Sequence, residues 1–313
     1  MSMKEVKNKK NKLRWVNLVK PSNKDRQDLK AEFGFHRIDL VDAFRLTYRS
    51  KIAKREDYVF LVLMVPAYNR ETRAITIHEI DLFIGKNFLV SVHQGKVAPI
   101  QKLFVSALKN TKKRADLMNR GVEHLLHQIV KDTLENTYPM IDVTNDELEE
   151  LKETIFYETA KRNVLVEEIL RIRRNITDMR KSLRGHGTVI EHLIKEEKER
   201  PSIKLVKSPA QFELLVHEAN EIWVSLESNK EMIEALEDAN DSMITHGLNS
   251  IIKTLTVFSA ILLPAAVMAG IFGMNTKNTP LIGHPLDFWI IILIGFILTL
   301  GLFIVLWRKH WIE

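Results

Sequence analysis

The sequence has 313 residues, no cysteine and a formal net charge of +6, and 27% of its residues are charged. The lack of cysteine excludes disulfides and thiolate metal sites, and the mixing of basic with acidic residues argues against a nucleic-acid-binding protein. The mean hydropathy of −0.11 conceals a division, because residues 1–250 are heavily charged and residues 251–313 are mostly apolar.

Residues 1–35 are basic and polar, and we expect a loose N-terminal arm there. No apolar run lies near Met1, so the sequence predicts no signal peptide. An α/β domain is expected over 36–145, with helices from 98 to 138. Its strands have a β-forming, apolar composition that predicts a mixed sheet, and they are Tyr58–Val65, Ala74–Phe83 and Asn87–His93. We expect Pro66 to end the first of them.

A helical hairpin region is expected over 146–207. Glu147–Arg184 has apolar residues at helical spacing and is predicted to be helical throughout, up to a break at Gly185-His186-Gly187. A stalk helix over 208–250 is expected to begin at Ser208-Pro209, because serine caps helices and proline suits the first turn. Only Gly247 weakens it, so it continues into the apolar region, with roughly 60 residues and about 90 Å of length. A stalk of this kind is normally built from several copies of a chain.

Two apolar segments follow, Thr254–Phe272 with 19 residues and Phe288–Trp307 with 20, and neither contains a charged side chain. Each can cross about 30 Å of hydrocarbon as a helix. We therefore predict transmembrane helices at 251–273 and 288–307, a loop at 274–287 and a tail at 308–313. Lys253, Arg308 and Lys309 flank the two helices. Positive charge favours the cytoplasmic side, so both termini are predicted to be cytoplasmic.

The stalk segment carries nine acidic residues and a single lysine, Lys230. The acidic residues are Glu213, Glu218, Glu221, Glu227, Glu231, Glu234, Glu237, Asp238 and Asp241. Two interpretations stay open: a solvated helix face, and a vestibule that attracts cations below a pore.

A stripe of polar, small and aliphatic residues recurs along the first predicted span at steps of three and four. Its members are Asn249, Ile252, Leu255, Ser259, Leu263, Ala266, Gly270 and Gly273. One helix face carries them all, so they are candidates for lining a pore, and Ile252, Leu255 and Leu263 could gate it by excluding water. Packing between membrane helices favours the same residue types and is the alternative interpretation.

The first predicted span ends in Ala269-Gly270-Ile271-Phe272-Gly273-Met274-Asn275-Thr276. A Gly-Met-Asn motif at this place, followed by a short loop and a second span, resembles the CorA family of magnesium transporters. Residues 81–93 resemble the family's strand motif, His124–Val130 the helix that follows, and Arg308-Lys309-His310-Trp311 its basic and aromatic end. The resemblance covers residues 35–313 and implies a homopentamer whose first spans line a central pore.

On this resemblance, Gly273, Met274 and Asn275 form the selectivity filter, and the stripe from Asn249 to Gly270 lines the pore. Mg²⁺ sheds water reluctantly and prefers oxygen ligands, so a ring of Asn275 amides can hold the hydrated ion. The expected function is transport of Mg²⁺, with Co²⁺ and Ni²⁺ as further ions, across the plasma (inner) membrane. The expected partners are further copies of the chain, the lipid bilayer and divalent cations, without nucleic acid or a covalently bound cofactor. No cytoplasmic regulatory metal site is assigned.

Two other functions stay open. The predicted loop has one acidic residue, Asp287, and Lys277 beside the filter, so it resembles the ZntB branch, whose relatives are linked to zinc; His284 is a candidate zinc ligand there. The second alternative is a membrane-anchored sensor or scaffold that transports no ion. His124 and His127 lie three residues apart without an evident third ligand, and are better explained as structural. The sequence has no glycine-rich phosphate loop and nothing that indicates an enzyme.

Overall fold

The computed structural model describes residues 3–45, 47, 49–157, 162–199, 205–274, 281, 283, 285–309 and 311. The chain divides into two compact units, Met1–Leu236 and Glu237–Glu313, and helix α9 (Pro209–Phe272) runs through the boundary between them. The first unit is an α/β domain with further helices, and the second contains the apolar end of α9 and helix α10 (Asp287–Arg308). The predicted order of an α/β domain, a long helix and two apolar helical segments is confirmed.

Six strands of the described residues form one mixed sheet, in the order β1-β2-β6-β5-β4-β3. Their bounds are β1 Met3–Lys7, β2 Arg14–Val19, β3 Lys51–Lys54, β4 Tyr58–Asn69, β5 Ala74–Gly85 and β6 Phe88–His93. β2 and β6 are parallel, with Arg14 opposite Phe88 and Val19 opposite His93, and the other neighbours are antiparallel. The three strands predicted from the sequence are confirmed as β4, β5 and β6.

The N-terminal segment belongs to this sheet, so the prediction of a loose arm over residues 1–35 is wrong. Trp15 and Leu18 of β2 are fully buried, and the Trp15 indole donates a hydrogen bond to the hydroxyl of Ser91 in β6 at 3.1 Å. The surrounding lysines concealed a short apolar run in β2 that is long enough for a strand.

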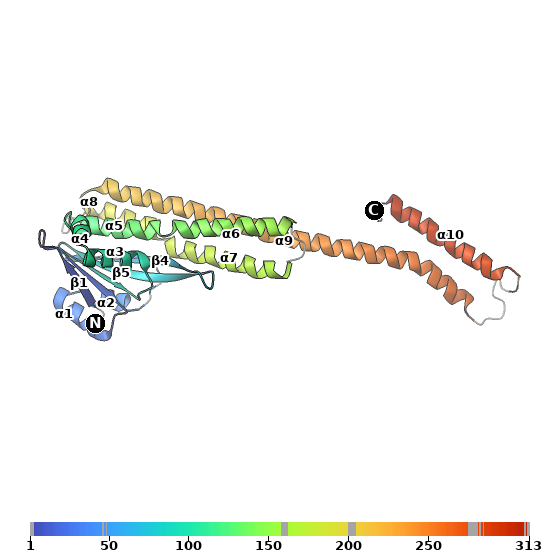
Figure 1. Ribbon diagram of the computed structural model, residues 1–313, viewed down its shortest axis with the longest axis horizontal. Helices are drawn as coiled ribbons and strands as arrows, with labels where there is room; N and C mark the ends of the chain where they lie inside the picture. Colours follow the sequence, from blue (N-terminus) through green and yellow to red (C-terminus); the bar gives the residue numbers. More distant parts are fainter. Residues whose placement is uncertain are drawn as a thin grey trace. The chain divides into compact units, whose positions relative to one another are not determined.

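Helices cover both faces of the sheet (Figure 1): α1 (Asn23–Phe33) and α2 (Arg37–Ala43) lie on one face, and α3 (Ala98–Lys109), α4 (Thr111–Met118) and α5 (Val122–Glu135) on the other. The side chains of β4 alternate between the two cores. Val59, Leu61, Leu63 and Val65 join the core with α3 and α5, and Tyr58, Phe60, Val62 and Met64 join the core with α1 and α2. A strand covered on both faces has a continuous apolar sequence, which explains Tyr58–Val65.

β4 continues past Pro66 to Asn69, so the expectation that Pro66 ends the strand is wrong. β3 pairs with β4 only from Val59 to Val62. At Pro66, one edge of β4 therefore faces no described strand, and a proline, which lacks a backbone N–H, is tolerated there.

Helices α6 (Tyr138–Tyr157) and α7 (Arg162–Leu183) lie side by side, and α8 (His186–Glu199) follows. The single helix expected from Glu147 to Arg184 is therefore two helices. Their facing sides share one apolar cluster with α9, formed by Leu148, Leu151, Ile155, Leu165, Ile169, Ile172, Ile176, Ile233 and Leu236. The start of α9 at Pro209 agrees with the sequence prediction.

Two carboxylates are buried on β5, on the side of the sheet that α1 and α2 cover. Glu79 and Asp81 are 5% and 4% exposed. Glu79 accepts hydrogen bonds from the backbone N–H and the hydroxyl of Thr47 at 2.7 and 3.1 Å. Burial, and then the neighbouring Glu79, raise the pKa of Asp81 well above its usual range, and the nearby Lys51 lowers it less. This shift favours the protonated form of Asp81, which can donate a hydrogen bond to Glu79.

The raised pKa of Asp81 predicts a stability that falls as the pH rises. The unfolded chain loses this proton at about pH 4, whereas the folded chain keeps it. The group therefore stabilises the fold fully below about pH 4, and this contribution is lost as the pH rises through the folded pKa, by up to about 1.4 kcal/mol per pH unit. Asp81→Asn keeps a donor toward Glu79 and cannot ionise, so its thermal unfolding in detergent should depend less on pH than that of the wild type.

Asp116→Asn, at an exposed position of α4, is the matched control and should follow the wild type. The prediction is contradicted if Asp81→Asn and wild type lose the same stability between acidic and neutral pH.

Candidate functional site

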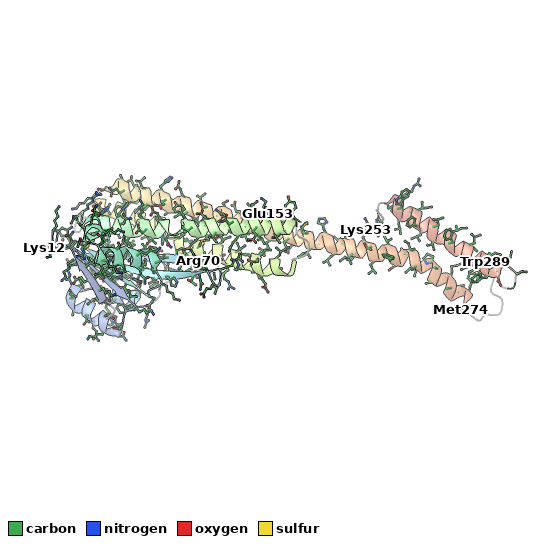
Figure 2. All side chains as sticks on the ribbon, in the orientation of Figure 1. Lys12, Arg70, Glu153, Lys253, Met274 and Trp289 are labelled. Carbon is green, nitrogen blue, oxygen red and sulfur yellow. The ribbon has the colours of Figure 1, made fainter. Side chains whose placement is uncertain are left out.

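The apolar end of α9 and the whole of α10 are long and apolar enough to cross a membrane. Figure 2 places Lys253 and Met274 at the two ends of this part of α9, and Trp289 near the start of α10. In the single chain almost none of these apolar windows is buried. Such a surface requires lipid or other copies of the chain to cover it.

One side of each apolar helix is less exposed than the rest of the helix. The half-exposed residues of α9 recur at helical spacing and are Lys253, Val257, Ala260, Ile261, Pro264, Met268 and Phe272. Those of α10 do the same and include Ile290, Ile291, Ile294, Gly295, Thr299, Leu302 and Leu306. These residues mark the side on which α9 and α10 face each other.

The predicted pore stripe lies on the opposite side of α9. All eight of its positions are exposed, namely Asn249, Ile252, Leu255, Ser259, Leu263, Ala266, Gly270 and Gly273. At about 100° per residue, the mean direction of the stripe is roughly opposite to that of the half-exposed residues. The structure therefore brings the eight residues to one helix face that α10 leaves uncovered, and their role as a pore lining stays a prediction.

The polar and apolar members of this face differ in what they can do. Ile252, Leu255 and Leu263 are 60%, 66% and 63% exposed, and rings of such side chains in a symmetric assembly can exclude water. Asn249 and Ser259 supply neutral oxygen atoms, and none of the eight residues is charged. Such a face can contact the water shell of a passing cation and does not need to bind the bare ion.

The C-terminal end of α9 explains the glycine of the Gly-Met-Asn motif. The N–H of Gly273 donates to the carbonyl of Ala269 at 2.9 Å, and that of Met274 to Ile271 at 3.3 Å. A Cβ at position 273 would approach the Ala269 carbonyl oxygen to 2.7 Å, so any other residue requires the backbone to move. The backbone of Gly273 is not in the left-handed conformation. Asn275 lies outside the described residues, as do Lys277 and His284.

The acidic residues of the stalk segment are partly neutralised. Glu227 pairs with Arg180 of α7 at 2.5 Å, and Lys230 lies 3.7 Å from Glu227 and 3.3 Å from Glu234. Paired groups of this kind fit a solvated helix face. Other members of the set are exposed, and these are Glu213, Glu221, Glu231, Asp238 and Asp241.

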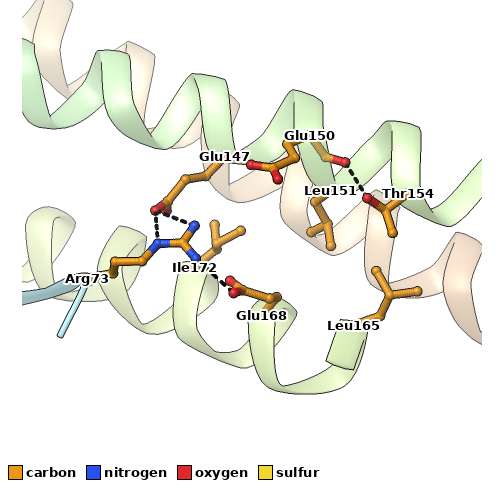
Figure 3. Close-up of a pocket in the computed structure, with 8 residues that line it drawn as sticks. All are labelled: Arg73, Glu147, Glu150, Leu151, Thr154, Leu165, Glu168 and Ile172. Carbon is orange, nitrogen blue, oxygen red and sulfur yellow. Dashed lines mark hydrogen bonds and ion pairs between the residues drawn. The ribbon is translucent and has the colours of Figure 1, made fainter. Parts of the chain in front are cut away.

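A pocket of about 220 Å³ lies between α6, α7 and the turn that joins β4 to β5 (Figure 3). Arg73 from this turn lies 3.0 Å from Glu147 of α6 and 2.9 Å from Glu168 of α7. Arg171 binds the same two carboxylates at 3.0 and 2.5 Å. Both carboxylates therefore form ion pairs with the two arginines. These ion pairs hold the turn against the two helices, and the carboxylates do not serve as cation ligands.

His124 and His127 of α5 are half-buried, and burial lowers the pKa of both. His127 packs edge-on against Phe212 of α9, with ring centres 5.5 Å apart. Within the described part of the chain, no group of three His, Asp or Glu side chains is placed to hold a metal ion. The arrangement agrees with the structural interpretation of these two histidines.

The start of α9 is held by a contact that the sequence analysis missed. Glu123 of α5 accepts hydrogen bonds from the backbone N–H groups of Lys207 and Ser208 at 2.6 and 2.7 Å, immediately before α9 begins. A carboxylate at this position also complements the positive end of the helix dipole. The partners are 84 and 85 residues apart, so no local pattern could have indicated them.

Residues 10–309 match the family described as CorA-like Mg²⁺ transporter protein. The cobalt/magnesium transport protein CorA of Methanocaldococcus jannaschii is 23% identical, over 96% of this chain and 92% of its own length. The complete structure of the CorA magnesium transporter from that organism has a TM-score of 0.80 at 22% identity, and the match covers 99% of this chain and 94% of that one. The ZntB cytoplasmic domain from Vibrio parahaemolyticus has a TM-score of 0.57 at 16% identity, over 75% of this chain and 88% of that one. The first structure shares the fold of nearly the whole chain, and the second shares the fold of the part that it covers.

Substitution of Leu255 separates a pore lining from a packing surface. In a pore, Leu255→Asn wets an apolar ring and should raise ion leak into dye-loaded liposomes; a barrier lower by about 1.4 kcal/mol makes the leak tenfold faster. Val257→Asn, on the side that faces α10, is the matched control and should leave the leak unchanged.

At a helix–helix contact, Leu255→Asn would instead weaken the oligomer without raising the leak, which native mass spectrometry detects. An unchanged leak together with an intact oligomer would contradict both interpretations.

Proposed function

We propose, from the premise that the chain belongs to the CorA-like Mg²⁺ transporter family, that it conducts Mg²⁺ across the plasma (inner) membrane as a homopentamer. At the level of the family it is a divalent-cation transporter and a membrane protein. The observation that carries the proposal is the uncovered face of α9, on which the stripe from Asn249 to Gly273 lies opposite the side that faces α10.

Assembly follows from the character of this face. A single helix cannot enclose a pore, and hydrocarbon offers no hydrogen bonds to the side chain of Ser259 inside the predicted span. Copies that meet around one axis, each with this face turned inward, would give this side chain water instead of lipid. The five-fold number comes from the resemblance to the CorA family, and α10 then lies on the outer side of each α9 and contacts lipid.

Selection of the ion is assigned to Gly273, Met274 and Asn275. Gly273 and Met274 follow the last residue of α9, Phe272, and Asn275 comes next in the sequence. A ring of neutral amides suits a divalent ion that keeps its first shell of water. A ring of carboxylates would hold the ion more tightly and slow its release.

The orientation in the membrane rests on the flanking charges. Lys253 precedes the first span, and Arg308 and Lys309 follow the second. Positive residues stay on the cytoplasmic side, so the unit Met1–Leu236 and both termini are assigned to the cytoplasm.

Zn²⁺ is the second candidate ion, because the loop between the spans contains Lys277 and His284 and has only Asp287 as an acidic residue. A lysine beside the mouth repels cations, and a histidine is a zinc ligand. The fold shared with the ZntB cytoplasmic domain is compatible with either ion. A membrane-anchored sensor that transports nothing would leave the uncovered polar stripe of α9 unexplained.

Ion flux through the purified protein in liposomes tests the proposal. We expect the protein to carry Mg²⁺ and Co²⁺ faster than protein-free liposomes and faster than it carries Zn²⁺. Faster Zn²⁺ flux would favour Zn²⁺ as the transported ion. If no divalent ion crosses the membrane, the membrane-anchored sensor is the function that remains. Native mass spectrometry in detergent should give a pentamer, and monomers alone would overturn the assembly.

Asn275→Ala tests the filter. The substitution removes the amide that would hold the hydrated ion, so Mg²⁺ flux should fall by at least about tenfold while the pentamer still forms. Asn278→Ala, three residues further along the loop, is the matched control and should retain flux. Wild-type Mg²⁺ flux in Asn275→Ala would mean that selection occurs elsewhere.

A further inference from the structure

Helices α3 and α4 carry a strongly basic surface on the side of the sheet opposite α1 and α2 (Figure 1). Residues 94–121 contain seven basic side chains and one acidic side chain, Asp116. The basic ones are Lys96, Lys102, Lys109, Lys112, Lys113, Arg114 and Arg120, and all of them except Arg114 are exposed. Within the described part of the chain, none of the five lysines forms an ion pair. Their charge is therefore free to act on a ligand.

Hydrogen bonds hold the corner between α3 and α4 in one geometry. The side-chain oxygen of Asn110 accepts from the backbone N–H groups of Lys112 and Lys113 at 2.9 and 3.1 Å. Arg114 donates from Nε and from a terminal nitrogen to two carbonyls at the end of α3, both at 2.9 Å. The backbone that carries the lysines is thus fixed before any ligand binds.

A groove of about 520 Å³ lies at this corner, and we call it the α3–α4 groove. It is lined by Gln101, Lys102, Val105, Ser106, Lys109, Asn110 and Lys113. Sites for small molecules commonly have volumes of about 300–1,000 Å³. None of these lining residues is acidic or aromatic, so the groove presents three ammonium groups without a carboxylate to oppose them. It attracts an anion with several charges, and it has no ring on which a nucleobase could stack.

The basic groups of the groove are of the kind that binds phosphate. Lysine is a common phosphate ligand and acts as a point charge, whereas bidentate recognition of a carboxylate uses the planar fork of arginine. The arginine at this corner, Arg114, already donates to the carbonyls of α3. Lys102 and Lys109 lie about two turns apart, roughly 10 Å along α3. Charge spread over this length suits a chain of phosphate groups better than a single one.

We propose that the α3–α4 groove binds a polyphosphate anion, either inorganic or the phosphate chain of a nucleoside triphosphate. Lys102, Lys109 and Lys113 neutralise the phosphates, and Lys112 next to them adds to the positive field. Val105 is 44% exposed and gives the groove an apolar contact for the part of a ligand beyond its phosphates. The groove lies apart from the predicted pore stripe, so its binding does not depend on ion transport.

Mg²⁺ competes with the groove for the same anion. Phosphate oxygens bind Mg²⁺, and the ion then neutralises two of the negative charges that would face the lysines. The free polyphosphate therefore binds more tightly than its Mg²⁺ complex. Occupancy of the groove falls as Mg²⁺ rises, and this link to the transported ion rests on the proposed function.

Isothermal titration calorimetry of the full-length protein in detergent, without divalent ions, tests the site with inorganic triphosphate. We expect saturable binding. Lys109→Gln/Lys113→Gln should weaken it at least about tenfold, because two of the three ammonium groups in the groove are lost. Lys24→Gln/Lys30→Gln on α1 is the matched control, since it removes the same charge from the other face of the sheet and should bind like the wild type.

Other anions separate recognition of phosphate from attraction by charge. Citrate and a polyglutamate peptide should bind at least about tenfold more weakly than triphosphate. Equal affinity for either of them, or an equal loss in the control variant, would overturn the polyphosphate site. ATP should compete with triphosphate; tighter binding of ATP assigns the groove to nucleotides, and weaker binding assigns it to inorganic polyphosphate.

An excess of Mg²⁺ over triphosphate should weaken binding at least about fivefold, and unchanged or tighter binding would overturn the competition. None of these titrations measures ion flux. Absence of flux in liposomes would therefore contradict the proposed function alone, whereas absence of triphosphate binding would contradict the groove alone.

Discussion

Hydrocarbon cannot hydrogen-bond the side chain of Ser259, which lies inside the predicted span on a face of α9 that α10 leaves uncovered. This constraint divides the surface of the helix. The side with Val257 and Met268 faces α10, and the polar and small residues need an environment that one chain does not supply. Several copies around an aqueous axis satisfy the constraint at once, because the polar groups then contact water and the aliphatic residues contact neighbouring helices or gate the pore.

The α/β unit is built around the same helix that enters the membrane. Phe212 and Leu215 of α9 belong to the large core beside the sheet, Glu123 binds the backbone just before the helix begins, and Arg180 of α7 pairs with Glu227 and stacks over Trp223 at 5.3 Å. Shared burial and charge-assisted hydrogen bonds thus tie α9 to two different layers of the unit. The buried residues of α9 end at Asn240, so the packing of the helix is concentrated in its N-terminal half.

Local sequence patterns sufficed for the strands β4 to β6, the start of α9 and the two apolar helices, because each depends on the spacing and length of apolar runs. The same reasoning failed at the N-terminus, where the many lysines concealed the short apolar run around Trp15. They suggested a loose arm, whereas the structure has two strands there. It also could not find Glu123 or the pairing of Arg73 with Glu147, whose partners are far apart in the chain. The stripe on α9 was predictable because one helix carries it, whereas Asn275 lies beyond the described end of that helix.

The parallel pairing of β2 with β6 has a consequence for how the protein is made. Strand β2 can complete its pairing with β6 only after residue 93 has been synthesised, and α9 completes the core still later through Phe212 and Leu226. All of these residues leave the ribosome before the first span does, and domains generally fold as units during synthesis, with the N-terminal one first. A largely finished α/β unit can therefore stand on the ribosome when the apolar end of α9 emerges. The apolar end of α9 and α10 would then insert into the membrane while the N-terminal part of α9 is already packed in the folded α/β unit.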